Sequence, residues 1–252
     1  MQPLQPAIKK DIIDHPFRKI EIVFEAGKTT LTTQDELLLN AYIRLHDLHL
    51  DIKNKAEKLY RESVAINQNI AFLQKELERV GATFNNCVEI ADKLSAAGYN
   101  PEEASLEKMM AARQETVSEL SDYNTKIVSV YEAAQALNKK MNEEADSDEE
   151  KLEALYDELT SLSMDHIENS ENNAIDPVAF DEQFNQFKGY ANSVANQCEH
   201  LLHSCDNVLT NYTNLNNQTT TIYNVWNEFL KRYDLLIAMS DLHNGAMEIN
   251  VN

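Results

Sequence analysis

The sequence predicts an all-α protein with minor β-structure at its termini: an elongated, antiparallel, coiled-coil-like bundle of three long, interrupted helices with an N-terminal β-hairpin. One observation behind this prediction is an apolar stripe that recurs every three or four positions from Phe180 to Leu236, broken only at Thr219. Its average step is that of a helix packed along a coiled-coil seam. The other is the scarcity of helix breakers, because the 252 residues hold five glycines and five prolines, and only Gly189 interrupts a predicted helix.

The first 33 residues are expected to form a separate N-terminal segment. Residues 1–18 show no periodic pattern, whereas Lys19–Thr32 is rich in β-branched residues and partly alternates between polar and apolar. This alternation predicts a β-hairpin whose turn lies at Ala26-Gly27, because glycine tolerates the backbone conformations of tight turns.

Residues 34–243 are expected to form the bundle, and residues 244–252 a tail with one short strand at Met247–Val251. The bundle consists of three arms of similar length: 34–97, 102–170 and 177–243. These arms would fold up, down and up, so that each buries its apolar stripe against the others. A more compact bundle of five or six shorter helices is the alternative.

Capping signals mark the start of each arm. Thr33 and Glu36 have the spacing of a capping box. Asn100-Pro101 and Asp176-Pro177 each combine an N-cap residue with a proline in the first helical turn. The second arm is expected to bury a stripe that includes Met110 and Val117.

Three positions bear on whether the predicted helices are continuous. Gly81 should break the first arm, and Ser147, with the capping-box spacing to Glu150, should kink or restart the second. Asn216–Thr221 in the last arm consists of poor helix formers, so a further break there stays open. Burial of the apolar stripe should decide that case.

The formal charge of −20 excludes some classes of partner. Binding to nucleic acid or to an anionic membrane surface relies on Lys and Arg, so neither is expected. The acidic surface suits a basic partner or is simply solvated.

The longest apolar run near the end, Leu235–Met239, is too short for a membrane span, and residues 1–16 lack the apolar core of a signal peptide. Three cysteines then suggest a reducing compartment, either the cytoplasm or a large assembly such as a virion, with leaderless export left open.

Clusters of histidine and cysteine do not predict a metal site. Cys198 and Cys205 share the apolar face of a helix, whereas His200 and His203 lie on another face, so the four cannot meet one ion. The pair of His46 and His49 lacks the Glu-x-x-His pattern of di-metal bundles. His49 is instead expected to make a polar contact within the core. No cofactor and no catalytic motif are predicted.

An uncharged segment provides the main candidates for an interface. Asn207–Asn227 carries no charge over 21 residues and is rich in Asn and Thr, so it is either covered by another subunit or a locally neutral exposed surface. The interface candidates in this segment are Asn211, Asn217 and Thr220. The others lie in the predicted terminal strands: Ile20, Ile22, Phe24, Ile249 and Val251. The last strand of one molecule would add to the hairpin edge of the next, which gives a head-to-tail assembly.

These observations favour a non-enzymatic structural or assembly subunit that binds itself or other protein subunits, for example in a virus or phage particle or a secretion-type apparatus. A cytoplasmic coiled-coil adaptor or tether is a second interpretation. A helical pore-forming protein is a third, although the most apolar stretches are too short to enter lipid.

Overall fold

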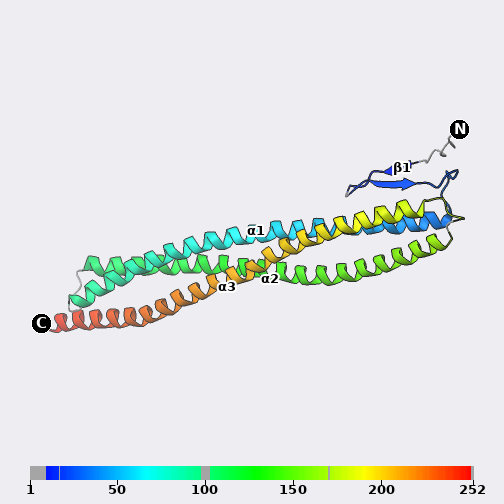
Figure 1. The fold of residues 1–252 in the computed structure, drawn as a ribbon. Helices are drawn as coiled ribbons and strands as arrows, with labels where there is room; N and C mark the ends of the chain where they lie inside the picture. Colours follow the sequence, from blue (N-terminus) through cyan, green and yellow to red (C-terminus); the bar gives the residue numbers. More distant parts are fainter. Residues whose placement is uncertain (1–9, 17, 98–102, 170, 251–252) are drawn as a thin grey trace. The chain divides into compact units, whose positions relative to one another are not determined.

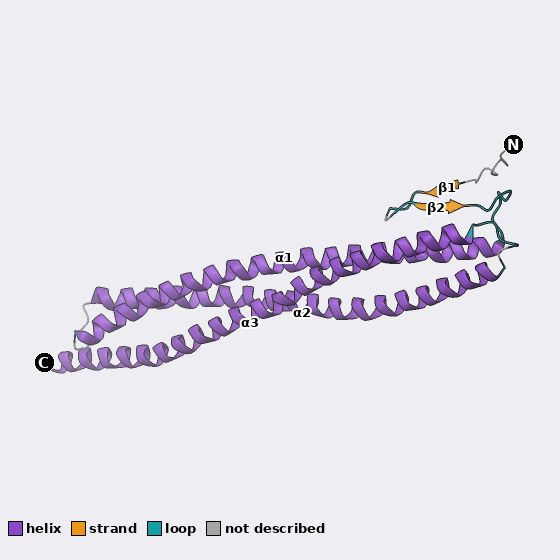
Figure 2. Ribbon diagram, in the orientation of Figure 1, coloured by secondary structure: helices purple, strands orange, loops and turns teal. Residues whose placement is uncertain are grey.

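The computed structural model describes residues 10–16, 18–97, 103–169 and 171–250 of the chain. Its elements, in chain order, are β1 (Lys10–Ile13), β2 (Ile20–Val23), α1 (Thr33–Ala96), α2 (Glu103–Glu168) and α3 (Pro177–Asn250) (Figures 1 and 2). The prediction of an all-α protein with three long helices and a small N-terminal β-sheet is confirmed. The predicted start of the second arm, Asn100-Pro101, lies outside the described residues.

The chain divides into two compact units, and each long helix contributes to both. The first unit comprises Met1–Glu62 and Leu137–Cys205, and the second comprises Ser63–Ala136 and Asp206–Asn252.

Within each unit, α1 is antiparallel to α2 and parallel to α3. The α1–α2 pairs that show this are Arg44–Glu158 and Lys55–Asp148 in the first unit, and Glu76–Lys126 and Arg79–Glu119 in the second. The α1–α3 pairs are Tyr42–Phe180 and His49–Phe187 in the first unit, and Phe84–Trp226 and Asp92–Arg232 in the second.

All three helices continue through the positions expected to break them. Helix α1 passes through Gly81, α2 through Ser147 and α3 through Asn216–Thr221. The predicted break at Gly81 and the predicted restart of a helix at Ser147 are therefore wrong, as is the bundle of shorter helices. One glycine costs a helix only about 1 kcal/mol, which is less than the gain from burying a single large apolar side chain.

The helical conformation of Gly81 leads to a testable prediction. A Cβ atom at this position would lie 3.9 Å from Ile222 Cδ1, which is ordinary contact, so Gly81→Ala should stabilise the protein by about 0.5–1 kcal/mol. Gly27→Ala is the contrasting variant. Gly27 has a φ of +87°, which is unfavourable for a residue with a side chain, so this substitution should destabilise the protein. Denaturant unfolding of both variants checks this, and a loss of stability in Gly81→Ala would refute the packing argument.

The first helix begins with a capping box one residue earlier than expected. The Asp35 amide donates to Thr32 Oγ1 at 3.2 Å, and the Thr32 amide donates to Asp35 Oδ2 at 2.7 Å. The predicted pair of Thr33 and Glu36 is wrong because the reciprocal bonds select Thr32 and Asp35. The predicted cap of α3 is confirmed, since Asp176 Oδ1 accepts the amide of Ala179 at 2.8 Å.

Asp35 also joins the start of α1 to two other parts of the first unit. Its carboxylate is fully buried and lies 2.8 Å from His166 Nε2 near the end of α2. It further accepts the backbone amides of Ala174 at 2.9 Å and Ile175 at 3.1 Å, in the segment that precedes α3. One side chain thus ties together two helix ends and the connection between α2 and α3.

The β-hairpin is built from different strands than expected. Strand β1 pairs with β2 in antiparallel register, with Lys10 opposite Val23 and Ile13 opposite Ile20. The predicted hairpin within Lys19–Thr32 is wrong: Ala26-Gly27 forms a turn that leads away from β2. The reason is a competing partner, because a residue of the α2–α3 connection takes the place of the expected second strand.

The second edge of β2 is already occupied within the chain. Phe24 forms a β-bridge with Ile175, and the Asp176 amide donates to the Val23 carbonyl at 2.8 Å. The Gln183 side chain of α3 completes this edge, because its amide oxygen accepts the Glu21 N–H at 2.6 Å and its amide nitrogen donates to the Glu21 carbonyl at 2.8 Å. A strand from another molecule therefore has no place at this edge.

The C-terminal strand is not present. Residues 247–250 are the last turn of α3, and Val251 lies outside the described residues. The predicted head-to-tail contact between terminal strands therefore loses its donor strand, and of the two edges of the hairpin, that of β2 is occupied within the chain.

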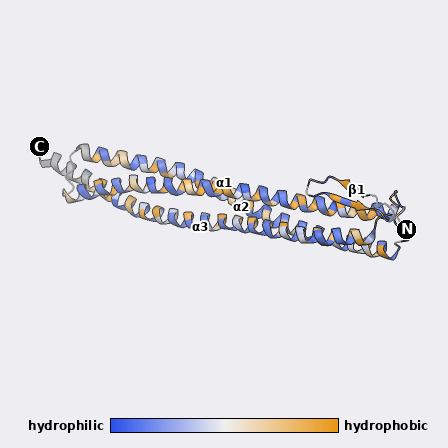
Figure 3. Ribbon diagram, turned by 45° about the horizontal axis from the view of Figure 1, so that its top comes forward, coloured by the Kyte–Doolittle hydropathy of each residue, from blue (hydrophilic) through white to orange (hydrophobic). Residues whose placement is uncertain are grey.

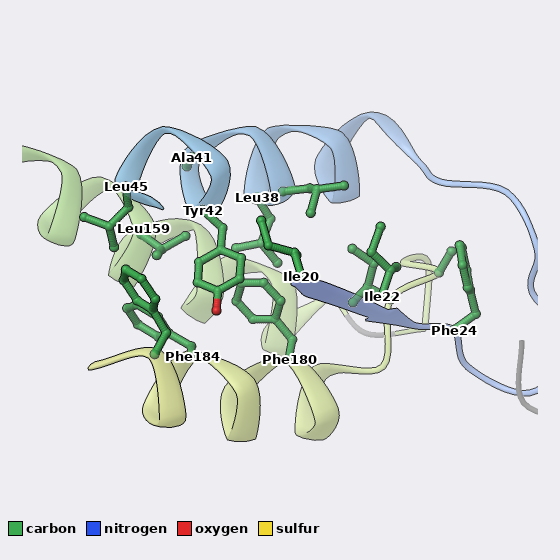
Figure 4. Close-up of a cluster of buried hydrophobic side chains, with 14 of the residues drawn as sticks. Ile20, Ile22, Phe24, Leu38, Ala41, Tyr42, Leu45, Leu159, Phe180 and Phe184 are labelled. Atoms are coloured by element: carbon green, nitrogen blue, oxygen red, sulfur yellow. The ribbon is translucent and has the colours of Figure 1, made fainter. Parts of the chain in front are cut away.

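The core of the first unit forms where the hairpin meets the three helices. Figure 4 shows Ile20 and Ile22 of β2 packed with Leu38 of α1, Leu159 of α2 and Phe180 of α3, all buried. Apolar residues recur along each helix among hydrophilic ones (Figure 3). The core of the second unit is formed by a separate cluster that includes Phe84, Met109, Leu120, Trp226 and Phe229.

Two histidines lie in the core of the first unit. His46 stacks on Phe187 with ring centroids 4.0 Å apart, and His49 Nε2 lies 3.1 Å from the Tyr156 hydroxyl. The polar contact predicted for His49 is confirmed. Burial lowers the pKa of His49 to about 4, and burial, reinforced by the neighbouring His15 and Arg18, lowers that of His46 to about 3.

The buried histidines make the stability of the protein sensitive to acid. Both rings stay neutral in the folded protein, whereas an unfolded histidine with a pKa of 6.5 takes up a proton. Their stabilising contribution is therefore complete above pH 6.5 and is lost as the pH falls from there toward about 4 for His49 and about 3 for His46. His49→Gln keeps a hydrogen-bonding group but cannot be protonated, so its unfolding free energy should fall less steeply. Urea titrations across this pH range measure both slopes, and equal slopes would contradict the prediction.

Candidate protein-interaction surface

In the second unit, four tyrosines set the register between α2 and α3. The buried Tyr123 hydroxyl lies 2.9 Å from Thr219 Oγ1, and the Tyr223 hydroxyl donates to the Leu120 carbonyl at 3.2 Å. Tyr131 packs on Tyr212 with ring centroids 5.1 Å apart. Thr219, the one break in the apolar stripe, is thus a buried polar partner. Burial raises the pKa of the Tyr123 and Tyr223 hydroxyls, so they remain protonated.

Helix α2 carries a second stripe outside the core. Its exposed members repeat in steps of four and three residues: Val117, Ser121, Asn124, Val128 and Tyr131. Val117 is 38% exposed and Val128 is 46% exposed. The charged side chains of this part of α2 point elsewhere, since Glu119 pairs with Arg79 and Lys126 with Glu76, both on α1.

Helix α3 continues this uncharged surface. Tyr212 and Tyr223 contact α2, and helical spacing places Asn216, Thr220 and Asn227 on the same side of α3; all five are exposed or half-buried. We call these five residues and the five of the α2 stripe the neutral face. No member carries a charge at neutral pH, although the whole chain has a formal charge of −20.

The threonines of this part of α3 are partly satisfied by their own helix. Thr220 Oγ1 donates to the Asn216 carbonyl at 2.9 Å, and Thr213 and Thr221 donate to the carbonyls of Leu209 and Asn217 in the same way. A hydroxyl that already donates a hydrogen bond costs less to remove from water than one that does not. Covering this segment with another protein therefore costs less free energy than its content of Asn and Thr suggests.

The interface candidates in the uncharged segment lie on different sides of α3. Asn211 faces α1, where its Nδ2 donates to Asn67 Oδ1 at 2.9 Å. Asn217 is exposed, and Thr220 belongs to the neutral face. The candidates from the predicted strands do not join them.

The strand candidates lie elsewhere in the chain. Ile20, Ile22 and Phe24 are buried in the core of the first unit, with 1%, 6% and 3% exposure. Ile249 is part of α3, and Val251 lies outside the described residues.

The α2 half of the neutral face was not recognised in the sequence. Val117 and Met110 were assigned to the buried stripe, but they are 38% and 53% exposed. The signal was present as two interleaved apolar series, since Val128 and Tyr131 each follow a buried residue, Ile127 and Val130. Periodicity alone does not tell which of two neighbouring series faces the core.

Two hollows elsewhere are less suited to contact with a protein. A groove of about 770 Å³ lies between α1 and α3 of the second unit, beside Gly81 and Ile222, and includes Glu78. A pocket of about 210 Å³ in the first unit has an apolar floor with Cys198, and its mouth holds Asp148 bonded to Lys55 at 3.0 Å. Burying either would cover ionised groups.

The histidine and cysteine positions agree with the helical geometry expected for them. Cys198 and Cys205 are buried, and His200 and His203 are exposed. Within the described ranges, no three His, Cys, Asp or Glu side chains are arranged to hold a metal ion. In the same ranges, no helix has an apolar stretch long enough to cross a bilayer.

Comparison with known proteins adds one structural similarity. No protein-family model and no curated protein matches the sequence. The structure is similar to a computationally designed three-helix bundle, with a TM-score of 0.44 and 13% sequence identity over 85% of this chain and 97% of that chain. The function is therefore argued from the residues of this chain alone.

Proposed function

We propose that this protein is a non-enzymatic structural or assembly subunit that associates with protein subunits through the neutral face. The observation that carries the proposal is the absence of charge over this part of the second unit in a chain with 42 acidic and 22 basic residues. Charged residues are depleted from the centres of protein interfaces because removing them from water is costly. Valines and tyrosines exposed among small polar groups have the composition of such a centre.

A single charge within the neutral face tests this proposal. In an extract of its source cells that is cross-linked before size-exclusion chromatography, the native chain should elute in a complex of at least twice its own 28.7 kDa. Val128→Glu would place a carboxylate in the covered surface and should shift the chain to the elution volume of the free protein. Val64→Glu is the matched control, since Val64 is a 37% exposed valine on α1 of the same unit and lies outside the neutral face.

The helix content of both variants, measured by circular dichroism, should equal that of the native protein. If Val128→Glu stays in the complex, or if Val64→Glu leaves it as readily, the neutral face is not the surface of assembly.

A further inference from the structure

We infer that the partner of the neutral face is the same face of a second copy of this chain, related by a two-fold axis with the helices antiparallel. This inference rests on the proposed function and names the partner of that surface.

Charge selects a second copy as the partner. Two chains of formal charge −20 repel each other wherever their acidic surfaces meet. The neutral face is a surface on which two copies can approach without bringing carboxylates together. A basic partner would gain more from the acidic parts of the chain than from this one. An uncharged surface is best matched by another uncharged surface, and the second copy provides one of the same size and shape.

The size of the face predicts a weak dimer. Val117–Tyr131 spans about 22 Å at 1.5 Å per residue, and two packed helices are about 20 Å wide. The footprint is then roughly 450 Å² per copy and 900 Å² in total, at the low end for specific protein interfaces. The dimer should form at micromolar concentration and dissociate on dilution.

The charges at the two ends of the face set the orientation. Glu132 and Asp206 lie at the end where Tyr131 meets Tyr212. Arg113, which lies over the Tyr233 ring at 5.0 Å, and Lys231, which is paired with Glu228, mark the other end, where acids and bases occur together. A parallel dimer would bring acid against acid, whereas an antiparallel dimer brings the acidic end of each copy to the end of the other that holds Arg113 and Lys231.

Lys231 is available for such a contact. Its side chain is 73% exposed, and its ammonium group is bonded to Glu228 at 2.6 Å within the same helix. An exposed pair of this kind exchanges partners at little cost in free energy. The intermolecular contact between Lys231 and Asp206 of the other copy is therefore expected to favour orientation more than affinity, because the two-fold axis lays α3 of one copy on α3 of the other.

Sedimentation equilibrium of the purified full-length protein over a range of concentrations tests the dimer. The native chain and Val64→Glu should show the same monomer–dimer equilibrium. Val128→Glu should weaken it by at least about tenfold, because two carboxylates are buried per dimer. A native chain that stays monomeric throughout overturns the inference, and so does a dimer that Val128→Glu leaves unchanged.

Cross-linking tests the orientation. Asp206→Cys and Lys231→Cys chains, mixed and oxidised, should form a disulfide between residue 206 of one chain and residue 231 of the other, because both lie on α3. The native cysteines Cys87, Cys198 and Cys205 are buried, and peptide mapping distinguishes them from the new ones. A mixture that dimerises without a disulfide between residues 206 and 231 would overturn the antiparallel arrangement.

The two proposals fail in different ways. If the purified chain is monomeric and Val128→Glu still abolishes the complex in the cell extract, the partner is not a second copy, but the proposed function stays supported. If the complex in the extract persists in Val128→Glu, both proposals are contradicted.

Discussion

Replacement of Asp35 by alanine is expected to lower the free energy of unfolding by about 3–5 kcal/mol, which is a large share of the stability of an ordinary domain. The carboxylate has no exposed surface, and the groups around it depend on it for their hydrogen bonds. In the variant, the amides of Ala174 and Ile175 and the His166 ring would lose their acceptor in the protein interior. Each such buried group costs about 1–3 kcal/mol.

The pKa of Asp35 gives this prediction a dependence on pH. Burial raises the pKa, but hydrogen bonds from Thr32, Ala174 and His166 outweigh it and lower the pKa to about 2, from an ordinary value of 3.8. A lowered pKa means that the stabilisation is present above pH 3.8 and is lost as the pH falls from there through about 2. Asp35 therefore adds a loss of stability that begins at the acid end of the range in which the buried histidines act and continues below it.

Denaturant unfolding of Asp35→Ala and Asp35→Asn measures the effect. The amide of asparagine keeps the shape and one acceptor oxygen, so its loss should be smaller. Asp47→Ala is the control for a general effect of removing an acid, because the Asp47 side chain is 63% exposed and bonds only to His15 among the pairs seen here; it should change stability by less than about 1 kcal/mol. Similar losses of unfolding free energy in Asp35→Ala and Asp47→Ala would show that the buried hydrogen bonds of Asp35 add nothing beyond the general effect of removing an acid.

Phe187→Ala is expected to cost about 3–5 kcal/mol, the range for removal of a buried aromatic ring. Phe187 is fully buried and lies at the centre of the aromatic core of the first unit. Its ring stacks on His46 and makes edge contacts with Tyr42 at 5.6 Å and His49 at 5.4 Å. Three large rings around the site leave little room for collapse, so the cavity term should be near its maximum.

The same unfolding measurement on Phe187→Leu and Tyr190→Ala separates packing from helix propensity. Leucine fills most of the space and should cost less than alanine. Tyr190 lies three residues further on α3 and is 41% exposed, so Tyr190→Ala should stay within about 0.5 kcal/mol of the native protein. A change of less than about 1 kcal/mol in Phe187→Ala would mean that the ring is not part of a close-packed core.

Local signals in the sequence predicted the ends of helices where no distant residue competes. Asp176-Pro177 was recognised as a helix start because a cap and a proline act within one turn. At Thr32 the prediction missed by one residue, because Asp35 also binds Ala174, which lies far away in the sequence. A short-range rule cannot include that contact.

Continuity of the helices was decided by packing. Gly81 and Asn216–Thr221 disfavour a helix locally, but both lie in helices that bury apolar side chains on either side. The same limit applies to the neutral face. Its α3 half could be recognised as a run without charge, whereas its α2 half became visible only when Tyr131 and Tyr223 were seen in contact with the neighbouring helix.

The amino-acid sequence alone determined the class of fold, the length of the first two helices and the inward position of Cys198 and Cys205, because these follow from a period of three to four residues along one chain. The tertiary structure decided the partner of β2, the burial of Ile20, Ile22 and Phe24, and the choice between two neighbouring apolar series on α2. Each of these depends on which distant segment competes for the same hydrogen bonds or the same apolar surface, and a pattern along a single helix or strand does not contain that information.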